Sequence, residues 1–294
     1  MKYVAVAALF GAILAAGSSD ASTFIPVIKT CAVGGEKFKF LDQASSTSWG
    51  QLPDGMRIGT GPNPGTLPQC PTNGLVMYRE FDKATVAKLA PIVAGGDYQA
   101  LRASETPYYL AYWLEKRLGD DSPAWLVLAA GWEAKNVDPA SPRARRYAEE
   151  FIALVAALPV NDTSLESIAL RARAANALRE VGRFAEAEAL RASIKVGADA
   201  GGTGSNAADN RTGWLEFLAA LAAPIARSDS ARAPIDMIGD REAAHRCLEP
   251  KMKPEPGAPP TTPLTAFEVG FCSRSEIAAA VTKMKEALGD RLVK

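Results

Sequence analysis

Apolar positions recur at helical spacing along most of the chain after residue 83, between clear start and stop signals. Thr106-Pro107 predicts a helix start, because proline is tolerated at the first helical position, and Gly119 predicts its end. Ser141-Pro142 predicts a second start. The helix that follows is expected to bury an apolar face made of Tyr147, Phe151, Leu154, Val155 and Leu158. This part of the chain is therefore predicted to be α-helical.

A different pattern occupies residues 23 to 82. Phe38 and Phe40 alternate with lysines, which is the period of a half-buried strand. The stretch from Gly50 to Gly65 is rich in glycine and proline and predicts a loop. The expected fold class is therefore mainly α, with a small N-terminal β segment.

Two short stretches in this β segment look like zinc knuckles that have each lost one ligand. They read Cys31-Ala32-Val33-Gly34-Gly35 and Cys70-Pro71-Thr72-Asn73-Gly74. A knuckle has the pattern Cys-Pro-x-Cys-Gly, and here Gly34 and Asn73 stand where its second cysteine would be. Two thiols remain where a tetrahedral zinc ion needs four ligands, so we expect them to form a disulfide.

The chain has four cysteines, an even number, and all of them follow an N-terminal export signal. In an oxidising compartment this number predicts two disulfides, although four cysteines allow three pairings. Sequential pairing joins Cys31 to Cys70 and Cys247 to Cys272. The alternative is one shared zinc site, which the wide spacing disfavours because structural zinc ligands come in closely spaced pairs. We therefore expect no metal and no cofactor.

The export signal is a Sec-type signal peptide. Lys2 supplies positive charge, Val4–Ala16 is an apolar run of 13 residues, and small residues follow it. A membrane span needs about 20 such residues, and no later stretch is long and apolar enough to cross a bilayer. The chain is expected to be periplasmic or secreted, with no membrane span after the signal is cleaved.

The region from residue 164 to 195 resembles a tetratricopeptide repeat, in which two helices meet through small residues. Thr163 and Glu166 predict a capping box at its start. The residues at matching spacings are Ala175, Leu178, Gly182, Phe184 and Ala187. The match is partial, because Arg191 replaces the late aromatic residue of the repeat.

The order of these parts resembles a bacterial family of unknown function. Its members carry an N-terminal zinc-ribbon segment followed by tetratricopeptide-like helices. The resemblance rests on the two knuckles, the Pro-Tyr-Tyr-Leu-Ala-Tyr-Trp stretch at 107–113 and the Gly-Arg-Phe-x-Glu-Ala turn from Gly182. It implies an architecture and no substrate. The resemblance covers roughly residues 28–195. The divisions expected from all of these signals are a signal peptide over 1–21, a disulfide-closed knuckle segment over 22–82, a tetratricopeptide-like domain over 83–195 and a C-terminal helical extension with flexible loops over 196–294.

Composition and motifs supply little chemistry. Lysine plus arginine equals aspartate plus glutamate, at 33 each, so nucleic acid is not an expected partner. His245 is the single histidine, and the chain has no Gly-x-Ser-x-Gly nucleophile elbow. The arginines from Arg171 to Arg191 alternate with glutamates and are interpreted as a solvated helix face. We therefore predict no catalytic residue.

Aromatic residues crowd the region from 108 to 132, including Trp113, Trp125 and Trp132. Core packing explains them first, but those that face outward would form a groove for a peptide or a glycan. The favoured hypothesis is an exported binding or scaffolding module whose partner is an envelope protein, a peptide or a cell-wall component. The alternative is a secreted hydrolase that uses carboxylates, which leave no sequence signature.

Overall fold

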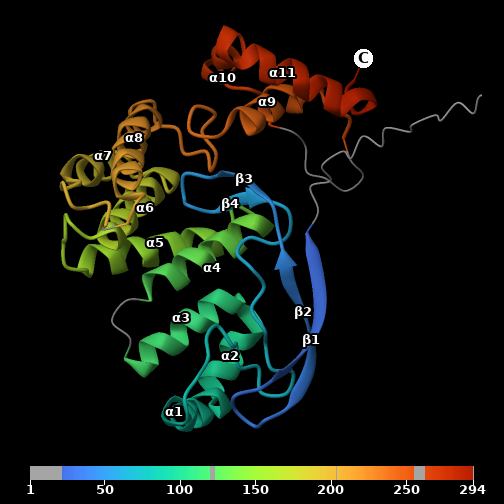
Figure 1. Ribbon diagram of the computed structural model, residues 1–294, viewed down its shortest axis with the longest axis vertical. Coiled ribbons are helices and arrows are strands. Elements are labelled where there is room, and N and C mark those ends of the chain that lie inside the picture. Colours follow the sequence, from blue (N-terminus) through green and yellow to red (C-terminus); the bar gives the residue numbers. More distant parts are fainter. Residues whose placement is uncertain (1–21, 120–122, 203, 255–261, 294) are drawn as a thin grey trace, which may run out of the picture.

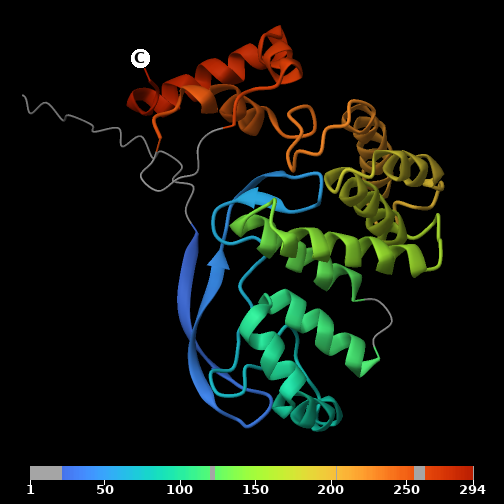
Figure 2. The same cartoon turned by 180° about the vertical axis from the view of Figure 1, so that it is seen from behind.

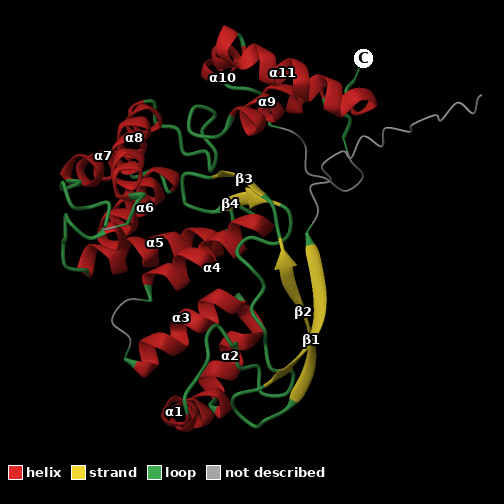
Figure 3. Cartoon of the chain, viewed as in Figure 1, coloured by secondary structure: helices red, strands yellow, loops and turns green. Residues whose placement is uncertain are grey.

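The computed structural model describes residues 22–119, 123–202, 204–254 and 262–293 (Figure 1). Strands come first and helices follow, which confirms a mainly α fold with a small N-terminal β segment (Figure 3). The predicted signal peptide over residues 1–21 lies outside the described residues. None of the described helices is long and apolar enough to cross a membrane.

Two antiparallel hairpins make up the β part of the described chain. They are formed by β1 (Thr23–Thr30) with β2 (Lys37–Ser45), and by β3 (Ser48–Gln51) with β4 (Arg57–Gly59). The longer β1–β2 hairpin is a two-stranded ribbon that runs along one flank of the molecule (Figures 1 and 2). Along β2, Phe38 and Phe40 are half-buried while the lysines between them are exposed, as the alternation predicts.

The two knuckle turns have the same backbone geometry and face each other. In each, the cysteine N–H donates to the carbonyl oxygen five residues on (2.8 and 2.9 Å), and the cysteine carbonyl accepts the N–H four residues on (3.1 and 2.9 Å). Cys31 and Cys70 are joined by a disulfide, with their Cα atoms 5.6 Å apart. A Cβ added to Gly34 would lie 3.8 Å from Asn73 Nδ2, which donates to the Val33 carbonyl (2.8 Å). The two positions that lack a knuckle cysteine therefore adjoin, and a disulfide and an amide join the turns.

Helices form the rest of the described chain. They are α1 (Lys83–Ala94), α2 (Gly96–Ser104), α3 (Pro107–Leu118), α4 (Ala124–Val137), α5 (Pro142–Ala157), α6 (Leu165–Glu180), α7 (Phe184–Ser193), α8 (Ala207–Ala226), α9 (Asp240–Leu248), α10 (Ala266–Cys272) and α11 (Ser275–Leu288). The predicted start and end of α3 and the predicted start of α5 are confirmed. Gly119 ends α3 with a left-handed φ of 83°, and Ser141 Oγ accepts the N–H of Ala144 at the start of α5 (3.2 Å).

Packing joins the β segment to the first helices. Cys31, Cys70 and Leu75 are fully buried in one apolar core with residues of α1, α2 and α3. The predicted division at residues 82 and 83 therefore does not coincide with a gap in the packing. A second, larger core fills the space among α3 to α8. Helices α9 to α11 form a separate cluster at one end of the molecule, closed by the Cys247–Cys272 disulfide (Figure 1).

Candidate functional site

The three tryptophans singled out in the sequence do not share one surface. Trp113 is half-buried beside Tyr98 (ring centroids 5.8 Å apart), under the guanidinium of Arg117. Trp132 is half-buried against the larger core, and its indole N–H donates to the Asp54 carbonyl (3.3 Å). Trp125, with 38% of its surface exposed, is the one of the three that solvent reaches most easily.

The candidate catalytic and metal residues are also placed. His245 is exposed on α9. The four cysteines are joined as Cys31–Cys70 and Cys247–Cys272, which confirms the sequential pairing. Within the described ranges, no group of three or more histidine, cysteine, aspartate or glutamate side chains could hold a metal ion.

Two carboxylates converge on a buried lysine in an ion cluster formed by Asp54, Lys135 and Glu180. The Lys135 ammonium on α4 binds the Asp54 carboxylate and the Glu180 carboxylate, the latter at 2.9 Å. Asp54 lies in the β3–β4 turn and is 2% exposed. The cluster therefore fixes this N-terminal turn on the inner faces of α4 and α6.

Two arginines of α6 also bind the β3–β4 turn and the loop before α9. Their burial corrects the interpretation made from the sequence. The stretch from Arg171 to Arg191 was expected to be a solvated face, but Arg173 is 7% exposed and Arg179 is fully buried. Arg173 donates to the Pro53 carbonyl (2.6 Å), and Arg179 donates to two carbonyls of the loop before α9. A guanidinium has five N–H donors, so carbonyl oxygens can satisfy it inside the protein.

Electrostatics make this cluster a clamp rather than an acid–base pair. Burial alone raises the pKa of Asp54, but Lys135 and Arg232 outweigh burial and hold this pKa below its ordinary value of 3.8. Burial lowers the pKa of Lys135, but Glu180 and Asp54 outweigh it and raise this pKa above 10.5. Asp54 and Lys135 therefore stay charged and paired with each other at neutral pH. A cavity of about 20 Å³ beside Asp54 has room for about one water molecule. A second cavity of about 270 Å³ reaches Lys135 and Glu180, whose side chains are only about one-tenth exposed.

An open groove lies elsewhere, where α5, α6 and α7 meet. It consists of two adjoining cavities of about 240 and 470 Å³, which share Val155, Leu158 and Arg171 as lining residues. The larger cavity is mainly apolar and includes Val160, which is 64% exposed. The guanidinium of Arg171 is paired with Asp162 (3.4 Å) at the boundary of the two cavities. We call this surface the α5–α7 groove.

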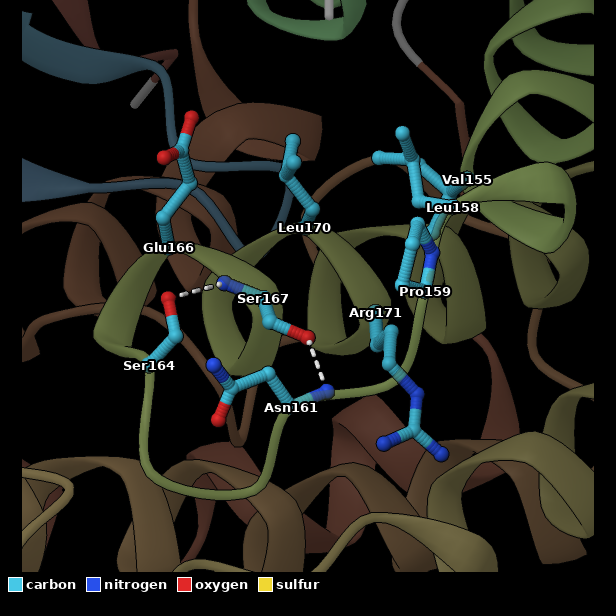
Figure 4. Close-up of a pocket in the computed structure, with 9 residues that line it drawn as sticks. All are labelled: Val155, Leu158, Pro159, Asn161, Ser164, Glu166, Ser167, Leu170 and Arg171. Carbon is cyan, nitrogen blue, oxygen red and sulfur yellow. Dashed lines mark hydrogen bonds between the residues drawn. The ribbon is translucent and has the colours of Figure 1, made fainter.

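The smaller cavity of the α5–α7 groove adds polar groups to the apolar lining (Figure 4). Ser164 Oγ accepts the Ser167 N–H (3.3 Å), and Ser167 Oγ accepts the Asn161 N–H (3.1 Å). Each hydroxyl retains a proton that it can donate to a ligand. Ser164 caps α6, so the predicted cap at Thr163 is wrong by one residue.

Glu166 does not take part in capping α6; its carboxylate instead accepts the indole N–H of Trp125 (3.0 Å). Glu166 lines the smaller cavity, so this hydrogen bond joins Trp125 to a lining residue of the α5–α7 groove, although Trp125 itself lines neither cavity. The sequence pointed to Trp125 and not to the groove itself. The available signal was Leu158-Pro159-Val160, a short apolar run where the helical pattern stops and a solvated loop is usual.

Comparison with protein-family models, curated proteins and solved structures finds no match to this chain.

Proposed function

We propose that this protein is an exported binding module that holds a polypeptide segment in the α5–α7 groove. The observation that carries the proposal is the pair of adjoining cavities with a mainly apolar lining, open to solvent. The exposed Trp125 is hydrogen-bonded to Glu166, one of the lining residues. Ligand sites are concave and mostly apolar, with a few polar groups that orient the ligand. The serine hydroxyls of the smaller cavity meet the last requirement, since they can donate to peptide carbonyls.

The helical architecture supports this proposal. Helices α4 and α5, and likewise α6 and α7, pack against each other across short turns. Ala175 and Ala187 are fully buried, and Gly182 turns the chain with a φ of 83°. These features fit the proposed tetratricopeptide-like pairing, in which small residues bring two helices close and stacked pairs present a groove.

A matched pair of exposed valines tests the groove. We expect a photo-cross-linking residue at Val160 to capture a polypeptide partner in the envelope, and the same residue at Val137 to capture none. Val137 is 87% exposed at the end of α4 and lines neither cavity. Val160→Glu should weaken retention of the captured partner by more than about tenfold, because it places a charge against an apolar contact.

Equal capture from the two positions would contradict the proposal, as would a Val160→Glu variant that binds normally. Loss of cross-linking at position 160 when cell-wall fragments are added before irradiation would move the assignment from a polypeptide to a glycan. Trp125→Ala should also weaken retention, because it removes the aromatic side chain bonded to Glu166 without opening a core position.

Export is the second testable part of the proposal. Two disulfides indicate an oxidising environment, and we propose that this environment is the periplasm. N-terminal sequencing of protein from the envelope fraction should begin between about residues 17 and 24, where small residues precede the cleavage point. Cytoplasmic protein that retains Met1 would contradict export.

A further inference from the structure

The β1–β2 ribbon has an outward face that is exposed at Pro26, Ile28, Lys39 and Leu41. Within the described chain, only its far end is covered, where the half-buried Gln43 donates to the Thr60 carbonyl (3.4 Å). In the antiparallel register, Pro26 lies opposite Leu41 and Ile28 lies opposite Lys39, so these side chains share one face. Ile28 and Leu41 are each 62% exposed, and Pro26 is also exposed. On the opposite face, Phe38 packs against the core formed with α1 to α3, Phe40 is half-buried, and Ile25 is 46% exposed.

Charge on this outward face has a single sign. Lys37 and Lys39 are exposed there, and neither forms an ion pair with another described residue. Lys29, on the inner face, is instead paired with Asp42 (3.2 Å). None of the side chains on the outward face is acidic, and these are Phe24, Pro26, Ile28, Thr30, Lys37, Lys39, Leu41 and Gln43.

We propose that this outward face binds the surface of a membrane that contains anionic phospholipid. Exposed aliphatic side chains can enter the boundary between headgroups and acyl chains, while lysine side chains extend to the phosphates. Each lysine near such a surface contributes about 1 kcal/mol. The position in the chain agrees, because six residues separate the predicted apolar run Val4–Ala16 from Thr23, the first residue of β1. The predicted signal peptide would bring the start of β1 to the membrane during export. This inference does not rest on the α5–α7 groove.

Co-sedimentation with lipid vesicles tests it. The exported protein should bind vesicles of equal parts phosphatidylglycerol and phosphatidylcholine, bind pure phosphatidylcholine much more weakly, and be released by high salt. Lys37→Gln with Lys39→Gln should reduce binding roughly 30-fold, from about fivefold for each lysine. Ile28→Ser with Leu41→Ser should reduce it more than about tenfold, through the loss of apolar area.

Two control variants match these changes on other surfaces. Lys83→Gln with Lys88→Gln removes two exposed lysines of α1, and Val137→Ser with Val269→Ser removes two exposed valines of other helices. Both controls should bind vesicles like the wild type. The proposal is overturned if the wild type does not bind anionic vesicles, or if ribbon and control variants bind equally. It is also overturned if the ribbon substitutions abolish a dimer instead, since the face would then join two copies of this chain.

Discussion

Asp54→Asn should lower the free energy of unfolding by about 3 kcal/mol, because it removes the buried carboxylate that pairs with Lys135 and Arg232. The amide keeps the shape of the side chain, and its oxygen can still accept the Met56 N–H, a bond that the carboxylate makes at 3.0 Å. The lost interactions are therefore the ion pairs with Lys135 and Arg232. Urea denaturation at neutral pH measures the difference.

The matched control is Asp42→Asn, which breaks another aspartate–lysine pair of the same protein. The side chains of that pair, Lys29 and Asp42, are 34% and 47% exposed. Exposed pairs contribute at most about 1 kcal/mol, so this variant should be close to wild type. Equal losses in the two variants would show that the cluster around Asp54 is not a buried clamp.

The same cluster sets a pH window for stability. The folded pKa of Asp54 lies below its ordinary value of 3.8, so its contribution is complete above that value and is lost as pH falls through the lower folded pKa. The folded pKa of Lys135 lies above 10.5, so its contribution is complete below that value and is lost as pH rises through the higher folded pKa. In the Asp54→Asn variant, the part of the fall in unfolding free energy at low pH that comes from protonation of Asp54 should be absent.

Local signals carried the predictions that the structure confirms. The starts of α3 and α5 follow from a proline beside a serine or threonine, and the end of α3 follows from Gly119. Each of these signals acts within one helical turn, so the sequence displays it directly. The disulfide between the knuckles could be predicted for a related reason, because both turns keep most of the residue pattern of a known motif.

The ion cluster of Asp54, Lys135 and Glu180 could not be predicted from local signals. Asp54 and Lys135 are 81 residues apart in the chain, and nothing in either neighbourhood marks the pairing. Arg173 and Arg179 lie in a stretch rich in arginine and glutamate, and a solvent-exposed helix face has the same composition. Arg173 and Arg179 differ from their neighbours only in what packs opposite them, namely the β3–β4 turn and the loop before α9. The α5–α7 groove could not be predicted either, because its lining comes from three helices that only the folded chain brings together.

The two disulfides should respond differently to reductant, with Cys247–Cys272 opening first. Exchange needs access of a thiolate to sulfur. Cys31 and Cys70 are 2% and 0% exposed inside an apolar core, whereas Cys272 is only half-buried at the edge of the α9–α11 cluster. Alkylation after increasing exposure to dithiothreitol, followed by peptide mass spectrometry, should label the C-terminal pair before the knuckle pair. Hydrogen exchange should then rise in α9 to α11 while α1 to α3 remain protected.

Removal of the knuckle disulfide should have the larger effect on stability. Cys31→Ala with Cys70→Ala releases a constraint over a sequence separation of 39 residues, and Cys247→Ala with Cys272→Ala releases one of 25. The chain-entropy relation gives about 4 and about 3.5 kcal/mol. The knuckle pair also shares its core with α1 to α3, so its loss weakens that core and exposes the fully buried Tyr98. The C-terminal pair closes only the α9–α11 cluster, so its loss should leave the urea transition of the rest of the protein nearly unchanged. A knuckle variant that unfolds like the wild type would contradict this order, and would show that the hydrogen bonds between the two turns are sufficient to hold them together.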